Sequence, residues 1–103
     1  MTETTVAAPP WSAEVERFVV AHGLRADLLL ALELVARAFG PRADITPQMQ
    51  FFPEEGERRV LVGIVANTDF DTAVACREVL ADSWTRELPL RAQDQMVFTY
   101  TTA

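Results

Sequence analysis

The sequence predicts one α+β domain with the element order α-α-β-β-α-β, in which helices pack on a three-stranded sheet. Three observations lead to this class. Residues 12–39 carry apolar side chains at helical spacing, residues 45–66 hold two β-prone runs around a turn, and residues 96–101 alternate like a strand after a third helical stretch. A chain of 103 residues, 50% of them apolar, has the length of one domain and enough apolar surface for a core.

Two consecutive helices are expected at the start of the domain. Ser12 is a suitable N-cap for a helix over residues 12–22, and Gly23 supplies a left-handed residue that ends it. The second helix, over residues 24–39, is apolar around most of its circumference. Such a helix requires cover on two sides.

Residues 1–10 are expected to form a flexible arm ahead of the domain at residues 11–103. The arm contains Thr4-Thr5-Val6, a short β-prone run suited to a sheet edge. The arm has neither the basic nor the apolar stretch of a secretory leader, and the most apolar segment of the chain is too short for a bilayer. With Cys76 as the single cysteine, the expected compartment is a reducing cytoplasm.

Two β-strands are predicted in the middle of the chain. Residues 45–52 form the first strand, and Pro47 assigns it to a sheet edge or a bulge, because proline cannot donate to a ladder. Residues 60–66 are apolar on both faces, as expected for the central strand. The turn at residues 53–57, which contains proline and glycine, makes the connection a hairpin.

A third helix and a last strand complete the pattern. Thr68 and Asp71 have the spacing of a capping box at the start of this helix, and Pro89 ends it. A polar loop then leads to the strand over residues 96–101. The apolar face of the helix is predicted to comprise Phe70, Ala73, Val74, Leu80, Ala81, Trp84 and Leu88.

The last five elements have the order αββαβ, which resembles a ferredoxin-like fold without its first strand. This resemblance is one of element order alone. Without that strand, the final strand lies beside the central one and parallel to it, joined by a right-handed crossover. The alternative places residues 45–52 in the middle of an antiparallel sheet, which Pro47 disfavours.

The charge balance excludes two classes of partner. The formal net charge is −6, and the only adjacent cations, Arg58 and Arg59, follow three glutamates. Phosphate binding needs clustered positive charge, so neither nucleic acid nor a membrane surface is expected as a partner. All 9 cations are arginines, which excludes Schiff-base chemistry and a P-loop lysine.

No group of residues forms a recognisable catalytic, metal or cofactor motif. His22 is the only histidine and is expected to interact with the last carbonyls of its helix. Cys76 is expected to be a small buried hydrophobe, and helix capping explains Asp69-Phe70-Asp71 better than metal binding does. The glutamates of residues 54–57 are expected to form a solvated turn.

The leading hypothesis is a non-enzymatic protein-interaction module, such as an adaptor, an antitoxin- or immunity-like inhibitor, or an accessory subunit of a defence system. It rests on the missing catalytic motifs, the apolar second helix and the two open edges of a three-stranded sheet. The expected partner is a second copy, in a two-fold dimer joined through sheet edges or helix layers, or a larger protein with a basic patch. The candidate interaction surface comprises Arg25, Leu29, Leu30, Glu33, Arg37 and Tyr100.

The alternative hypothesis is a regulatory domain that binds a small ligand as a dimer, by analogy with ferredoxin-like sheets. An enzyme ranks third, because the sequence does not bring a convincing set of carboxylates and arginines together. No cofactor is expected.

Overall fold

The computed structural model describes residues 11–102. The predicted order α-α-β-β-α-β is confirmed, with one short helix added before the last strand. The predicted arm of residues 1–10, with Thr4-Thr5-Val6, lies outside the described residues. The elements are α1 (Ala13–His22), α2 (Arg25–Phe39), β1 (Asp44–Phe52), β2 (Glu57–Val65), α3 (Phe70–Glu87), α4 (Leu90–Gln95) and β3 (Met96–Thr101).

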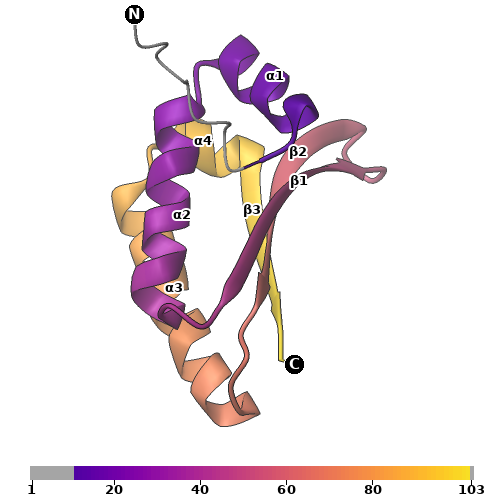
Figure 1. The fold of residues 1–103 in the computed structure, drawn as a ribbon. Helices are drawn as coiled ribbons and strands as arrows, with labels where there is room; N and C mark the ends of the chain where they lie inside the picture. Colours follow the sequence, from indigo (N-terminus) through magenta and orange to yellow (C-terminus); the bar gives the residue numbers. More distant parts are fainter. Residues whose placement is uncertain (1–10, 103) are drawn as a thin grey trace, which may run out of the picture.

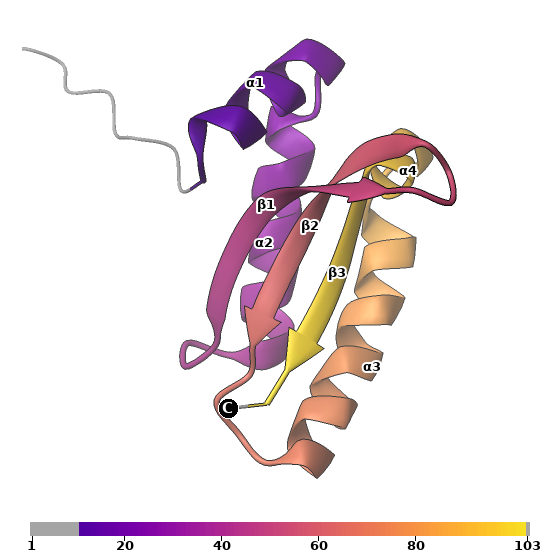
Figure 2. The ribbon, with the colours of Figure 1, turned by 90° about the vertical axis from the view of Figure 1, so that its right-hand side faces the viewer.

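The described part of the chain forms two layers. One layer is a three-stranded sheet in the order β1-β2-β3, and α2 and α3 lie side by side on one of its faces (Figure 1). β1 and β2 are antiparallel, whereas β2 and β3 are parallel and are joined by the crossover through α3 (Figure 2). The predicted position of β2 in the centre and of β1 at an edge is therefore confirmed. No described element covers the opposite face of the sheet.

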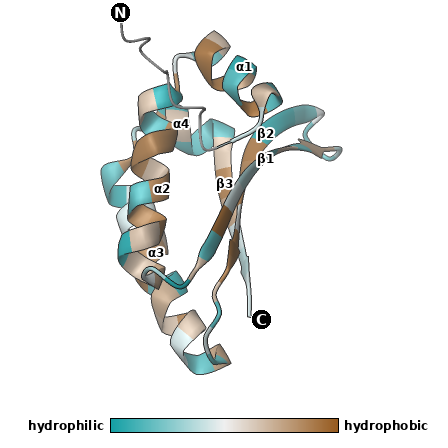
Figure 3. Cartoon of the chain, in the orientation of Figure 1, coloured by the Kyte–Doolittle hydropathy of each residue, from teal (hydrophilic) through white to brown (hydrophobic). Residues whose placement is uncertain are grey.

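β2 occupies the centre because its residues from Val60 onward are apolar on both faces. In Figure 3 the part of β2 beside the helices is hydrophobic, whereas its end at the hairpin, which begins with Glu57, is hydrophilic. Strand register places the side chains of directly opposite residues on the same face of the sheet. Towards the hairpin this helix-facing side carries Arg58, which pairs with Glu14 of α1. Beside α2 and α3 its positions are apolar: Ile45, Pro47 and Met49 of β1, Val60, Val62 and Ile64 of β2, and Met96, Phe98 and Tyr100 of β3.

α1 and α2 begin and end close to where the sequence predicts. The Ser12 hydroxyl accepts a hydrogen bond from the Val15 backbone N–H at 3.2 Å, and Gly23 ends α1 with a left-handed φ of 66°. α2 is covered by the sheet on one side and by α3 on another (Figure 1). Within α2, Leu29 is the one large apolar side chain that stays exposed, at 44%. The fold itself therefore covers most of the apolar surface of α2, and the composition of this helix does not by itself require an outside partner.

The start of α3 differs from the prediction by one residue. Asp69, and not Thr68, is the N-cap, because its carboxylate accepts hydrogen bonds from the backbone N–H of Thr72 at 2.8 Å and from its hydroxyl at 2.9 Å. Phe70, predicted to lie on the apolar face, is 66% exposed in the first turn. Four other residues of the predicted face are buried: Ala73, Leu80, Trp84 and Leu88.

The residues after Pro89 form α4 instead of the predicted polar loop. Pro89 stands at the N-cap, where its fixed φ suits a helix start and its missing N–H breaks no helical bond. Ala92 is buried in the core, and the Gln93 side-chain amide donates to the carbonyls of Leu88 at 2.8 Å and Thr85 at 3.1 Å. Six residues are too few to show a helical period in the sequence.

Candidate docking groove

The two edges of the sheet expose different backbone groups. Along any strand, the N–H and C=O groups of successive residues point alternately to its two sides. The Thr101 carbonyl accepts a hydrogen bond from the Ala66 N–H at 2.8 Å, so the backbone groups of every second residue from 97 to 101 face β2. The backbone groups of Phe98 and Tyr100 therefore point away from the sheet, towards the open edge.

Proline protects the edge of β1 but not the edge of β3. The same alternation places the backbone groups of Ile45, Pro47 and Met49 on the outer side of β1. Pro47 has no N–H, so it interrupts this edge near its middle. The sequence of β3 (M-V-F-T-Y-T) contains neither a proline nor a charge. β3 therefore has the edge that is able to accept another strand.

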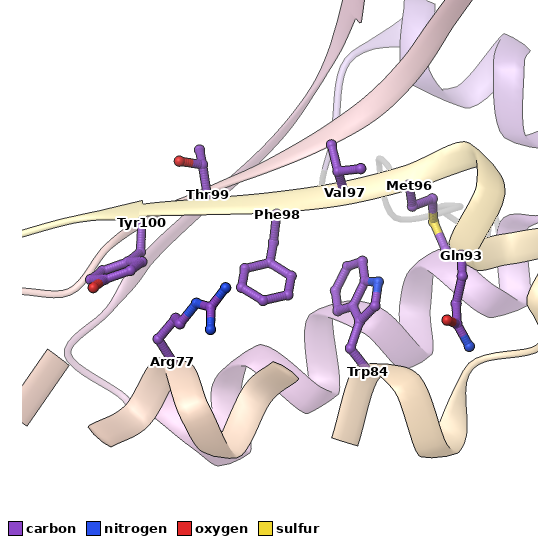
Figure 4. Close-up of a pocket in the computed structure, with 8 residues that line it drawn as sticks. All are labelled: Arg77, Trp84, Gln93, Met96, Val97, Phe98, Thr99 and Tyr100. Atoms are coloured by element: carbon purple, nitrogen blue, oxygen red, sulfur yellow. The ribbon is translucent and has the colours of Figure 1, made fainter. Parts of the chain in front are cut away.

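A groove of about 470 Å³ runs along this edge, between β3 and α3 (Figure 4). We call it the β3 groove. Five consecutive residues of β3 line it, including Val97 and Thr99, whose side chains point away from α3 (Figure 4), so the groove follows the strand edge itself. In Figure 2, α3 lies beyond β3 on the side away from β2. The lining residues are Arg77 and Trp84 of α3, Gln93 of α4, and residues 96–100.

Aromatic contacts hold the walls of the β3 groove in place. The rings of Trp84 and Phe98 meet edge to face with their centroids 4.9 Å apart, and Tyr100 lies against Phe39 of α2 at 6.1 Å. Trp84 is only 7% exposed, so it anchors α3 to β3. The hydrogen bonds of Gln93 fix the turn between α3 and α4 at one end. The groove is therefore preformed.

Among the described residues that line the β3 groove, Arg77 alone is charged. Its guanidinium points from α3 towards β3, beside the rings of Phe98 and Tyr100 (Figure 4). Arg77 forms no salt bridge within residues 11–102. Within the described part of the chain, the groove thus combines aromatic walls, strand backbone groups that no other strand pairs with, and one cation without a salt bridge.

The sheet face that carries no described helix is a second exposed surface. Gly63 lies in its middle, between Thr46 of β1 and Thr99 of β3. The apolar side chains on this face, Leu61 and Val97 among them, are only partly exposed. This face therefore lacks the large apolar patch that marks many interfaces, and the β3 groove is the stronger candidate.

The charged residues of the predicted interaction surface form salt bridges along the helix layer. Arg25 pairs with Glu16 of α1 at 3.2 Å. Arg37 pairs with Glu33 on the same helix and with Glu87 of α3 at 3.5 Å. The hydrogen bond that Arg37 donates to the Glu33 carboxylate, together with the charge of Glu87, raises the pKa of Arg37, which is exposed. These pairs connect neighbouring helices.

The apolar residues of the predicted surface lie in different surroundings. Leu29 is exposed on α2, whereas Leu30 is partly buried and packs against the core. Tyr100 lies apart from both, in the β3 groove. The structure therefore does not join the six predicted residues into one surface.

Structural contacts surround the three residues considered for chemistry: His22, Cys76 and Asp69. The Nδ1 atom of His22 lies 2.9 Å from the Phe18 carbonyl oxygen, which confirms its predicted contact with the end of α1. Cys76 is partly buried beside the core and not fully buried as predicted. The hydrogen bond from the Thr72 backbone N–H, followed by that from its hydroxyl, lowers the pKa of Asp69. Within residues 11–102, no three metal-binding side chains come together.

Across the same residues, no helix is both long enough and apolar enough to span a bilayer.

The sequence predicts only part of the β3 groove. It predicted the open edge of β3 and selected Tyr100, but it did not select Arg77 or Trp84. The available signal was an uncharged, proline-free strand after a helix whose apolar face also bears an arginine. The position of α3 beyond β3, which makes the groove, depends on packing between distant segments.

No family model, no curated protein and no solved structure matches this chain.

Proposed function

We propose that this chain is a non-enzymatic protein-interaction module that binds an extended segment of a partner protein as a fourth strand beside β3. The observation that carries the proposal is the unprotected edge of β3 along the groove. In this mode of recognition, free backbone groups supply hydrogen bonds and side-chain pockets supply specificity. An adaptor, an inhibitor or an accessory subunit would use such an edge.

The widths of the two layers support a missing strand. Neighbouring strands lie about 4.8 Å apart, so three strands cover roughly 14 Å. Two packed helices with their side chains span about 20 Å, which leaves room for roughly one more strand. The extra width lies on the side of β3, where α3 extends beyond the sheet (Figure 2). A fourth strand would bury its helix-facing side chains against α3.

The same geometry disfavours a two-fold dimer joined through β3. In such a dimer, each α3 would lie over the β3 strand of the other copy. If each α3 lies one strand spacing beyond its own β3, the two α3 helices of the dimer would be about 5 Å apart. Packed helix axes need about 8–10 Å, so the two helices would clash. A second copy would therefore dock on the helix layer, where Leu29 is exposed, and β3 would be left for an extended segment.

The volume of the β3 groove also favours a second candidate function, a regulatory domain that binds a small ligand. Small-ligand sites measure about 300–1,000 Å³, and the groove of about 470 Å³ falls within this range. An acidic molecule would match Arg77. A small molecule would leave most of the free backbone groups of β3 unpaired, however, so the strand edge favours a polypeptide.

The Tyr100→Pro variant tests the proposal. Its missing N–H and its ring block the open edge at residue 100, as Pro47 does on β1. The matched control is Tyr100→Val, which keeps the N–H and a β-prone side chain. Proteins captured from a lysate of the source organism are compared by mass spectrometry.

We expect one partner to be captured by the wild type and by Tyr100→Val and to be lost with Tyr100→Pro, while circular dichroism shows both variants folded. For a captured partner, amide exchange then checks that Phe98 and Tyr100 become protected in the complex. Capture that survives Tyr100→Pro, with no protection of these amides, would contradict docking at β3.

A further inference from the structure

We infer that the partner segment carries an acidic side chain that binds Arg77, and an apolar side chain two residues away that packs beside Trp84. This inference rests on the proposed function and names the chemistry of the partner. Its first ground is the charge balance of the chain, which has 15 acidic and 9 basic residues.

Most arginines of this chain already have a carboxylate. Six of the nine pair with Asp or Glu: Arg25, Arg37, Arg58, Arg59, Arg86 and Arg91. The three without such a partner within residues 11–102 are Arg17, Arg42 and Arg77. Acidic residues outnumber basic ones in this chain. An arginine without a carboxylate partner therefore marks a place where the described residues supply no acid. Of these three, Arg77 is the one beside an open strand edge.

The surroundings of Arg77 favour a carboxylate over other groups. The described residues that line the β3 groove include no acid, and its walls are aromatic rings and strand backbone. Arg77 is exposed in the free protein, and a strand docked beside β3 would remove part of its contact with water and so strengthen its pairing with a carboxylate. A guanidinium offers a planar fork of donors that fits both oxygens of a carboxylate. A basic segment would be repelled.

The spacing of the two contacts follows from strand geometry. Side chains on one face of a strand recur every two residues, about 6.6 Å apart. Figure 4 places Arg77 between Tyr100 and Phe98 along β3, and Trp84 between Phe98 and Met96. The points at which an added strand would meet Arg77 and Trp84 are therefore two residues apart along that strand. An added strand meets both with an acid and an apolar residue separated by one residue.

The probe for this inference is a phage library of random heptapeptides, selected on the full-length chain. We expect enriched peptides to share an acid and an apolar residue two positions apart. Arg77→Gln should weaken their binding at least about ten-fold, since hydrogen bonds between charged groups contribute this much. Arg77→Glu should shift the selection towards basic peptides. The control is Arg17→Gln, which removes another unpaired arginine, on α1, and should change binding less than two-fold.

Amide exchange of the peptide complexes separates the two levels of the argument. Peptides that protect Phe98 and Tyr100 but contain no acid, and that bind Arg77→Gln as well as wild type, would overturn this inference and leave the docking proposal standing. Peptides that bind elsewhere, or a selection that enriches none, would overturn both.

Discussion

The side chain of Asp69 determines where α3 begins. Its carboxylate accepts two hydrogen bonds from Thr72, one from the backbone N–H and one from the hydroxyl. These bonds stabilise the ionised carboxylate and lower the pKa of Asp69 in the folded chain. A lowered folded pKa means that the cap stabilises the fold above the unfolded pKa of about 3.9 and loses its effect as the pH falls through the folded value.

Replacement of this cap should therefore have a pH-dependent cost. Asp69→Ala is expected to lower the free energy of unfolding at pH 7, and the difference from wild type should shrink as the pH falls below about 4. Urea unfolding at several pH values measures this difference. Asp71→Ala is the control, because Asp71 lies in the same first turn and accepts no side-chain hydrogen bond within the described residues. A loss that is equal at pH 7 and pH 3 would contradict the capping role.

Two neighbouring leucines on α2 show how the helix is oriented. Leu28 is fully buried in the hydrophobic core, whereas Leu29 is 44% exposed. Leu28→Ala is expected to lower the free energy of unfolding by about 2–5 kcal/mol, because it leaves a cavity. Leu29→Ala should change it by no more than about 0.5 kcal/mol. Urea unfolding of both variants tests this orientation, and similar losses would show that a partner or a second copy buries Leu29.

Local signals explain which elements the sequence predicts. The doubly apolar run from Val60 identifies the central strand, and Pro47 assigns its neighbour to the edge, because each signal acts within its own strand. The exact start of α3 was missed because Thr68 and Asp69 are adjacent residues that both suit an N-cap. α4 was missed because six residues show no clear period.

Contacts between distant segments explain why the β3 groove was only partly predicted. Arg58 pairs with Glu14 of α1, and Arg91 of α4 pairs with Asp27 of α2 at 3.3 Å. Spacing in the sequence does not reveal such long-range salt bridges. It therefore does not reveal that Arg77 has no salt-bridge partner within residues 11–102. In the same way, the offset of α3 from β3 arises when the whole helix layer packs on the sheet (Figure 2). Strand pattern alone identified Tyr100.

At the scale of the whole molecule, the described residues form a two-layer fold in which α3 extends beyond the sheet on the side of β3 (Figure 2). Pro47 interrupts the edge of β1, whereas no strand among residues 11–102 pairs with the outer edge of β3. Six of the nine arginines pair with carboxylates, three of them between helices, whereas Arg77 in the β3 groove has no such partner within residues 11–102. These features are the grounds for the proposal that a partner docks at β3 and not at the surface of α2.

The central claim is that the edge of β3 is open in the free protein, and amide hydrogen exchange measured by NMR tests it most directly. The account predicts that the amides of Phe98 and Tyr100 exchange fast, while those of Val97 and Thr99, which face β2, exchange slowly. This alternation should persist as the protein is diluted. Equal protection of all four amides would show that something already covers the edge, and would contradict the account.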